Sequence, residues 1–409
     1  MSKRWNDTGS KLPIILIFGA LVHGAYADGY RNPPPTAEGI AKSGANMAFV
    51  DDASAISYNP ANLSLQTNKS FVVGAAIAQL QTKYTHPILG GYESDDPWQP
   101  LPSVYFSTPL GDQGTAVGIG ISTPYGQGLA WNASDFSSFI PSPPPPTAGP
   151  VPYEASMALI NFNPTVSTML GDKVALGVGL DIMYSAVELK ALIPNAPPLD
   201  SKGEGDGWGF GSNIGLTWLP TERQRVAFTY RSKVDIDYKG DFTVEGADYG
   251  AFGTTINLPN SIGLGYGVQV SESIQIEALI EWLEWSSNKT QPLDAGVYGS
   301  NPQENNWNDT VTMGVGGSWR LTDVFAFHAG YSFIETPVPD EAITPLLPDA
   351  DRHVIGLGLG YTVAGHALDI SYAFSIYEAR TRPAGAPGDP SGDYDIDSNL
   401  VGLTYSYSF

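Results

Sequence analysis

The sequence contains no cysteine, which excludes disulfide bonds and thiolate metal sites. Only 15% of its 409 residues are charged, well below the roughly 25% of soluble domains. Because the 20 basic residues are outnumbered by 42 acidic ones, the chain lacks the basic face that a nucleic-acid-binding protein needs. After the N-terminal segment, the longest apolar run is residues 71–78, too short for a membrane-spanning helix. A nucleic-acid partner and a helical membrane protein are therefore both excluded.

Aromatic residues and glycine are abundant instead. Aromatics make up 11% of the chain, and there are 46 glycines. A disordered chain would contain few aromatics and more charge. The composition therefore leaves an all-β protein, which is either a sandwich, a soluble barrel or a membrane β-barrel.

The N-terminal segment has the pattern of a secretory signal peptide. Lys3, Arg4 and Lys11 precede the apolar residues 12–22, and a small-x-small ending follows at residues 25–27. This order of charge, apolar run and small residues is typical of an export signal. We therefore predict a signal peptide over residues 1–27 and an exported protein.

Strict alternation of apolar and small or polar residues characterises the rest of the chain. Leu368, Ile370, Tyr372, Phe374 and Ile376, for example, fall on one face of an extended segment. We count fourteen such segments, many with ten or more residues, which is the length that crosses a bilayer at a tilt. Short turns alternate with long loops between them, as in outer-membrane barrels. The prediction is a 14-stranded antiparallel transmembrane β-barrel over residues 69–409 in the bacterial outer membrane.

The last strand ends on Phe409, an aromatic terminus that is typical of outer-membrane barrels. We expect Phe409 to engage the barrel-assembly machinery, and we expect the barrel to contact outer-membrane lipid and lipopolysaccharide. Residues 28–68 differ, because they alternate little and contain capping signals. Asp51 can cap a helix near Ala53, and Asn59 can cap another that begins with Pro60. This segment is predicted to be an N-terminal hatch that plugs the barrel.

Four motifs together carry a family resemblance. They are DDASAISYNPA at residues 51–61, GWGFG at 207–211, TYRSKVDIDYKG at 229–240 and PVPD at 337–340. With these motifs, the whole chain from the hatch to its last residue closely resembles FadL/TodX-type outer-membrane transporters of hydrophobic compounds. Asn59, Pro60 and Ala61 are weak evidence alone, but their place in an N-terminal hatch is specific.

The resemblance implies that substrates leave sideways through a gap where the third strand kinks inward. A physical basis for a kink exists here, because Pro124 cannot donate a ladder hydrogen bond and Gly126 and Gly128 permit bulges. The alternative is that this strand simply ends at Ser122. The residues assigned to the kink and opening are Thr123, Pro124, Tyr125, Gly126, Gln127 and Gly128.

The substrate class stays open between aromatic hydrocarbons and long-chain fatty acids. The resemblance implies that fatty-acid transporters meet the carboxylate with basic residues near the end of strand five and the start of strand ten. Ala191 and Asn308 occupy those places here, although Lys190 is adjacent and is a possible head-group contact. This departure favours neutral hydrophobes. We expect Phe136, Phe139 and Ile140 in a long loop to capture substrate from outside.

Charged residues on the strands are expected to line the lumen and to anchor the hatch through salt bridges. They are Arg231, Lys233, Asp235, Asp237, Glu277 and Glu281.

No motif for nucleophilic catalysis, phosphate binding or metal binding occurs, so we expect no enzyme activity, metal or cofactor. The sequence therefore predicts a passive outer-membrane transporter whose partner is a hydrophobic small molecule. The alternatives are a general porin for polar solutes and a non-transport adhesin or scaffold.

Overall fold

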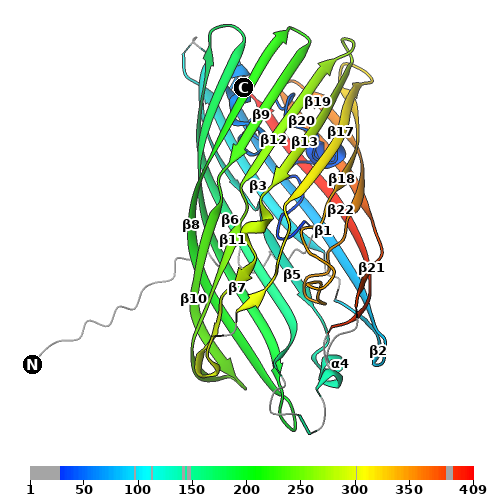
Figure 1. The fold of residues 1–409 in the computed structure, drawn as a ribbon. Coiled ribbons are helices and arrows are strands. Elements are labelled where there is room, and N and C mark those ends of the chain that lie inside the picture. The colour runs from blue at the N-terminus through cyan, green and yellow to red at the C-terminus, as the bar shows by residue number, and fades with distance from the viewer. Residues whose placement is uncertain are drawn as a thin grey trace, which may run out of the picture.

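The structure is a computed structural model that describes residues 28–95, 98–111, 114–140, 143–144, 149–300, 302–383 and 390–409. It confirms the predicted closed, antiparallel 14-stranded β-barrel with short helices near the N-terminus (Figure 1). The predicted signal peptide lies outside the described residues. Among the described residues, no helix has the length and apolarity needed to cross a membrane.

Each wall strand pairs with the next along the chain, and β1 pairs with β22 to close the barrel. Strands β4 and β5 share the third position of the wall, β9 and β10 the seventh, and β11 and β12 the eighth. The wall strands are β1 (Ser70–His86), β3 (Gln99–Pro109), β4 (Thr115–Ser122), β5 (Gly126–Ala130), β6 (Val151–Leu170), β7 (Val174–Ile193), β8 (Leu199–Thr221), β9 (Gln224–Arg231), β10 (Val234–Val244), β11 (Ala247–Leu258), β12 (Ser261–Gln269), β13 (Ile274–Leu283), β17 (Thr310–Arg320), β18 (Phe325–Ile334), β19 (Arg352–Val363), β20 (His366–Tyr377) and β22 (Gly392–Ser408).

The long connections carry short elements near the lower end of the barrel in Figure 1. They are β2 (Gly90–Glu93), α4 (Ala133–Phe136), η2 (Ser137–Phe139), η3 (Trp285–Ser287), β14 (Thr290–Gln291), β15 (Leu293–Ala295), η4 (Gly296–Tyr298), β16 (Gln303–Glu304) and β21 (Arg380–Arg382).

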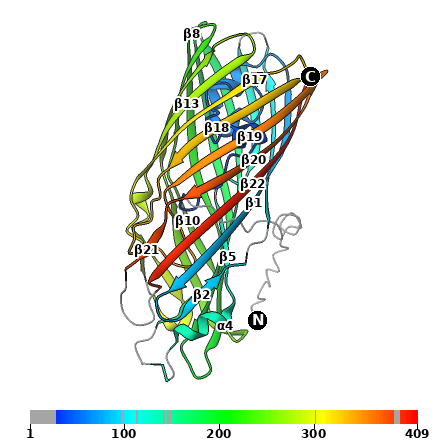
Figure 2. The same cartoon turned by 90° about the vertical axis from the view of Figure 1, so that its right-hand side faces the viewer.

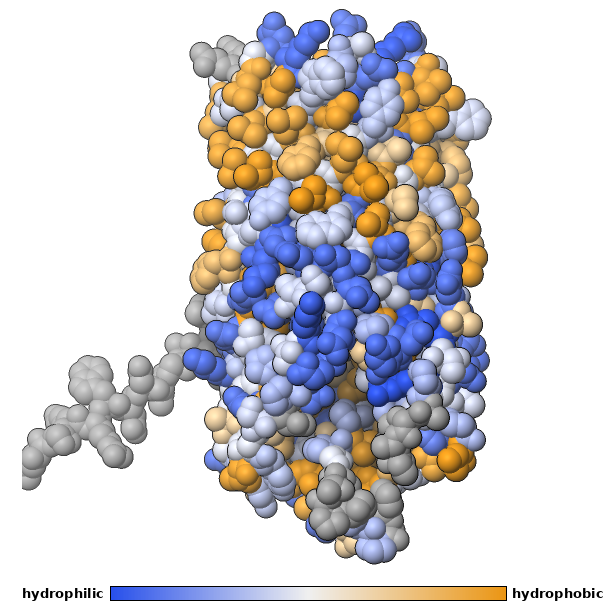
Figure 3. Space-filling model, viewed as in Figure 1, coloured by the Kyte–Doolittle hydropathy of each residue, from blue (hydrophilic) through white to orange (hydrophobic). Residues whose placement is uncertain are grey.

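The alternation in the sequence separates an outer apolar face from an inner small or polar face. On β20, Leu368, Ile370 and Tyr372 are about half exposed on the outside, whereas Ser371 and Ala373 on the other face are buried. Figure 3 shows apolar side chains gathered toward the upper end of the barrel, which carries the short turns and the C-terminus, and hydrophilic ones below. The lipid-facing band therefore occupies the short-turn half of the wall.

The segment before β1 lies inside the barrel, where Figures 1 and 2 show its helices in blue. It contains α2 (Ala37–Ala41), α3 (Ala55–Tyr58) and η1 (Pro60–Leu65). Helix α2 contacts β19, β20 and β22, and η1 contacts β6, β7 and β8 across the lumen. We call this segment, residues 28–68, the hatch.

The third wall position is interrupted. Strand β4 pairs with β3 as far as Ile121, opposite Val104, and residues 123–125 then separate β4 from β5. Strand β5 pairs with β6 only, so residues 100–103 of β3 have no ladder partner on that side among the described residues. The chain turns inward here because Pro124 lacks the N–H that would continue a ladder.

Candidate functional site

The triplet Asn59, Pro60 and Ala61 is buried at the start of η1. The Asn59 Oδ1 accepts the Ala61 N–H at 3.2 Å, and its Nδ2 donates to the Thr217 Oγ1 of β8 at 2.8 Å. The structure therefore confirms that Asn59 caps a helix beginning with Pro60. One amide side chain both starts the helix and ties it to the wall.

The expected cap by Asp51 is wrong. The Asp51 carboxylate instead pairs with Arg225 of β9 at 2.5 Å. Its neighbour Asp52 accepts the Ser54 N–H at 2.8 Å. The sequence alone does not show which of two adjacent aspartates will bond to the backbone of the following helix. In the structure Asp51 pairs with a wall arginine, and Asp52 bonds to the backbone.

Two wall glycines let the triplet lie directly against the backbone of the barrel. A Cβ added to Gly215 of β8 would lie 2.1 Å from the Asn59 Oδ1, and one added to Gly177 of β7 would lie 2.3 Å from the carbonyl carbon of Pro60. Neither contact is compatible with a side chain. Glycine at these positions therefore sets how closely the hatch approaches the wall.

We expect Gly215→Ala to loosen the hatch. Because overpacking typically costs about 1–3 kcal/mol, amide hydrogen exchange over residues 59–65 should quicken roughly tenfold or more. The matched control is Gly253→Ala in β11, where the added Cβ would meet nothing closer than 3.6 Å. Equal exchange in both variants would show that Gly215 does not position the hatch.

A buried carboxylate holds the middle of the hatch. Glu277 of β13 is 2% exposed and accepts backbone N–H groups from three successive residues. They are Met47, Ala48 at 2.6 Å and Phe49 at 3.3 Å. Because the hatch contributes only backbone N–H groups to these bonds, the side chains of residues 47–49 give no signal from which the bonds could be predicted.

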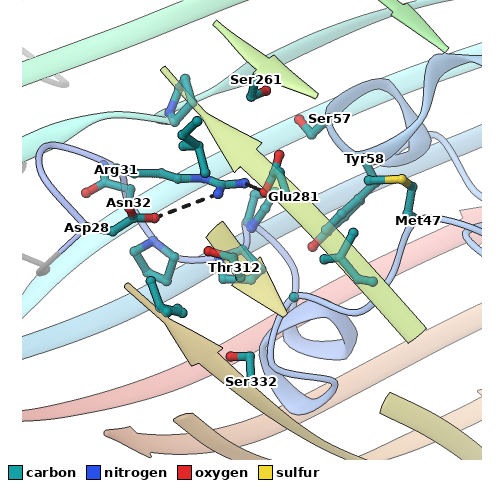
Figure 4. Close-up of a pocket in the computed structure, with 18 of the residues that line it drawn as sticks. Asp28, Arg31, Asn32, Met47, Ser57, Tyr58, Ser261, Glu281, Thr312 and Ser332 are labelled. Carbon is teal, nitrogen blue, oxygen red and sulfur yellow. Dashed lines mark ion pairs between the residues drawn. The ribbon is translucent and has the colours of Figure 1, made fainter. Parts of the chain in front are cut away.

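A cavity of about 210 Å³ lies between the hatch and the wall. Figure 4 shows Arg31 reaching from the hatch toward Glu281 of β13, with Tyr58 and Met47 beside them. The Arg31–Glu281 ion pair measures 2.6 Å, and both residues line the cavity. The cavity also touches the interruption between β4 and β5 through residues 122–125. We call this interruption, at the third wall position, the strand-three break.

The first hatch residues take the place of a strand beside this break. The Asn32 N–H donates to the Pro124 carbonyl at 3.0 Å, and the Gly126 N–H donates to the Tyr30 carbonyl at 2.9 Å. The Asn32 side chain also donates to the Thr123 carbonyl at 2.9 Å. Residues 30–32 therefore satisfy backbone groups that the wall leaves unpaired at the kink.

The remaining kink residues continue into regular structure. Gln127 and Gly128 lie in β5 opposite Met157 and Ser156 of β6. The Gln127 side chain donates to the Leu346 carbonyl of a long loop at 2.6 Å. The break is therefore confined to residues 123–125, and Gln127 ties its far side to the loop.

The structure places only part of the expected lumen network on the inner face of the barrel. Arg231, Glu277 and Glu281 lie on the inner face. The expectation is wrong for Lys233, Asp235 and Asp237, which are exposed outside the barrel.

A one-residue shift explains this error. Odd-numbered residues such as Ala227 point inward in β9, but even-numbered ones such as Val234 and Ile236 point inward in β10. The interruption at residues 232–233 flips the faces, because a one-residue slip exchanges the two sides of a strand.

Asp181 is an inward-facing residue that contacts the cavity-lining Arg231, and the sequence does not single it out. It is fully buried in β7, where its carboxylate accepts Asn161 Nδ2 at 2.6 Å and Asn213 Nδ2 at 3.0 Å and pairs with Arg231. The available signal was its position on the same inward face of β7 as Gly177 and Gly179. Its partner Arg231 lies two wall positions away, so the pairing could be predicted only from the register of the barrel strands.

The expected capture residues are buried rather than exposed. Phe136 and Phe139 fold inward with Ile140 and are 2–9% exposed. Phe136 packs against Trp131 with ring centroids 5.5 Å apart, and Phe139 lies 6.1 Å from Tyr84. They belong to one apolar cluster that continues to Tyr125 at the strand-three break. This loop fills the outer lumen in the structure.

Lys190 lies away from the cavity. Its Nζ pairs with Glu154 at 2.9 Å and with Glu188 at 3.2 Å. Lys202 pairs with Glu188 on the other side at 3.3 Å. These carboxylates neutralise Lys190, which leaves it little attraction for a substrate head group.

Asp349 connects a long loop to the first hatch residues. Its Oδ2 accepts the Gly29 N–H at 3.0 Å, and the residue is 1% exposed. Burial raises the pKa of the Asp349 carboxyl to about 7, although Arg352 and the Gly29 N–H oppose the shift. A raised carboxyl pKa makes the folded state bind more protons than the unfolded state. Stability is therefore lost as the pH rises from about 4 through 7.

We expect Asp349→Asn to stabilise the folded arrangement around residue 349 at pH 8, because the amide removes a buried charge, and to change it little at pH 5. The linkage difference is on the order of a few kcal/mol, since each pKa unit corresponds to about 1.4 kcal/mol. Amide exchange of residues 28–35, compared between variant and parent at each pH, measures the effect. Glu341→Gln removes an exposed charge from the same loop as a control. The same difference at both pH values would contradict the assignment.

Within the described part of the chain, no group of three or more histidine, aspartate or glutamate side chains could hold a metal ion. The polar groups around the cavity are instead arginines, carboxylates, amides and hydroxyls. The arrangement therefore offers hydrogen bonds and charge to a bound molecule.

A family model described as outer membrane protein transport protein (OMPP1/FadL/TodX) matches residues 21–409. The chain is 26% identical over 392 residues to the 47 kDa outer membrane protein of Pasteurella multocida, covering 88% of this chain and 89% of that one. It is 24% identical over 417 residues to the long-chain fatty acid transport protein of Escherichia coli O6:H1, covering 88% and 90%.

Solved structures show the same fold. A Pseudomonas aeruginosa FadL homologue superposes with a TM-score of 0.81 at 18% identity, covering 93% of this chain and all of that one. The Pseudomonas putida toluene transporter TodX gives a TM-score of 0.74 at 18% identity, covering 94% and 99%.

Proposed function

Because the chain belongs to the OMPP1/FadL/TodX family of outer-membrane transport proteins, which carry hydrophobic substrates, we propose that hatch movement opens a lateral exit at strand three. The family resemblance and the outer-membrane location predicted from the sequence are confirmed. The family is made up of transport channels rather than enzymes. Substrates proposed for this chain are aromatic hydrocarbons or long-chain fatty acids.

One observation carries the proposed exit. Residues 30–32 of the hatch occupy the place of a strand at the break of strand three, and both border the same cavity. Withdrawal of residues 30–32 would leave residues 124–126 without those partners and would join the cavity to the space beside β3. A movement of a few residues would therefore open the wall without unfolding it.

Lateral exit suits an apolar solute energetically. Transfer from water to lipid releases about 25 cal/mol for each Å² of apolar surface, and an exit into the membrane keeps that gain. The apolar cluster containing Phe136, Phe139 and Ile140 reaches Tyr125 at the break. We propose that rearrangement of this cluster admits substrate from outside and that the cavity is an intermediate binding site.

Uptake by whole cells tests the proposal. A deletion strain should take up toluene or oleate more slowly than the same strain carrying the gene. If the two strains took up toluene at equal rates and oleate at equal rates, transport of hydrophobic substrates would be rejected. Planar bilayers test the porin alternative, because a plugged transporter should conduct ions weakly and a general porin strongly.

A further inference from the structure

Three arginines line the cavity, and two of them are neutralised by carboxylates. Arg31 pairs with Glu281, and Arg231 pairs with Asp181. Arg352, the first residue of β19, differs from them. It is 5% exposed, and its Nε and Nη1 are buried without a hydrogen-bond partner. Among the described residues, no carboxylate lies within ion-pair distance of it.

The surroundings of Arg352 compensate only partly for its burial. Its guanidinium lies 5.8 Å from the centre of the Tyr377 ring, within the range of a cation–π contact. Asp28 and Asp349 are close enough to interact with it electrostatically, but burial raises the pKa of both carboxyls. The pKa of Asp349 is about 7, so its negative charge is weakened near neutral pH. A buried guanidinium in this state is a strong, unsatisfied donor.

Two unsatisfied hydroxyl groups lie on the same wall. Thr312 of β17 is opposite Ile334 of β18, which is opposite Arg352, so the three form a row across neighbouring strands. Ser332 lies two residues from Ile334 on β18. The hydroxyls of Thr312 and Ser332 are buried without partners, and Figure 4 shows both residues at the cavity. A pure hydrocarbon would leave all these groups unpaired.

We propose that Arg352 binds the carboxylate of an amphipathic substrate, with Thr312 and Ser332 adding hydrogen bonds. The planar fork of a guanidinium matches the two oxygens of a carboxylate. Apolar residues of the same cavity, including Ile334, Val354 and Leu400, provide contacts for an alkyl chain. The inference rests on the proposed transport function. It moves the head-group contact from Lys190 of β7 to Arg352 of β19 and favours a fatty acid over an aromatic hydrocarbon.

Binding to the purified full-length protein tests this assignment with oleate and its uncharged analogue, methyl oleate. The parent should prefer oleate, and Arg352→Gln should weaken oleate binding roughly tenfold or more, as expected for loss of a charge-assisted hydrogen bond. Methyl oleate binding should change less than about twofold, and Arg352→Lys should retain part of the preference. Lys233→Gln, which removes an exposed positive charge outside the barrel, should alter neither ligand.

Equal losses for oleate and methyl oleate, or no loss in a folded Arg352→Gln protein, would overturn the assignment. Heat-modifiable migration on gels reports whether the barrel is folded. If that variant fails to fold, the parent alone decides, because a protein that binds methyl oleate as tightly as oleate has no carboxylate site. Failure of transport itself would appear separately, as unchanged cellular uptake on gene deletion.

Discussion

A disulfide between residues 31 and 125 should stop uptake, and a reductant should restore it. Arg31 and Tyr125 form an isolated antiparallel bridge between the hatch and the strand-three break. The flanking hydrogen bonds run from Asn32 to Pro124 and from Gly126 to Tyr30. That pattern marks a pair with Cα atoms about 4.5 Å apart, which a disulfide can span. The chain has no other cysteine to compete.

Cells carrying Arg31→Cys with Tyr125→Cys should therefore take up oleate or toluene at the rate of the deletion strain until they are reduced. Each single cysteine variant controls for loss of the Arg31–Glu281 ion pair or of the Tyr125 ring. Complete cross-linking with unchanged uptake would remove the hatch movement from the mechanism, whatever the single variants do.

Loss of the Glu277 carboxylate should have the second largest effect. Glu277→Ala leaves the N–H groups of Met47, Ala48 and Phe49 without their acceptor. Removing one partner of a buried charged interaction typically costs about 3–5 kcal/mol. The hatch should open more often, so ion conductance in planar bilayers should rise above the parental level while the barrel stays folded.

Glu277→Gln keeps an acceptor oxygen and should fall between the parent and the alanine variant. Glu272→Ala removes an exposed charge from the turn before the same strand and should conduct like the parent. Parental conductance in Glu277→Ala would mean that other contacts, such as those of the Asn59 triplet, hold the hatch alone.

The wall was predictable from sequence because one physical rule governs it. A strand between lipid and lumen must alternate, and Leu368 to Ile376 do so visibly. The same rule failed beyond Arg231, because the interruption at residues 232–233 reverses the two faces and places Asp235 outside. Nothing in the alternation before or after the interruption identifies where the reversal occurs.

The site was less predictable because its partners come from distant strands. The resemblance drew attention to Lys190, which the structure pairs with Glu154 and Glu188. Arg352 stands at the start of an ordinary strand, and only the closed barrel shows that its Nε and Nη1 have no hydrogen-bond partner among the described residues. Similarly, Phe136 looked like an exposed loop residue until the loop was seen to fold into the lumen.

The length of the wall strands has a consequence for how a hydrophobe first meets the cell. Strand β8 has 23 residues, about 75 Å along the strand, whereas about 9–11 tilted residues cross a bilayer. The half of β8 near the long loops therefore stands clear of the hydrocarbon region, in the hydrated layer at the membrane surface. That hydrated layer repels apolar solutes, so a barrel of this height lets them bypass the layer inside a protein wall.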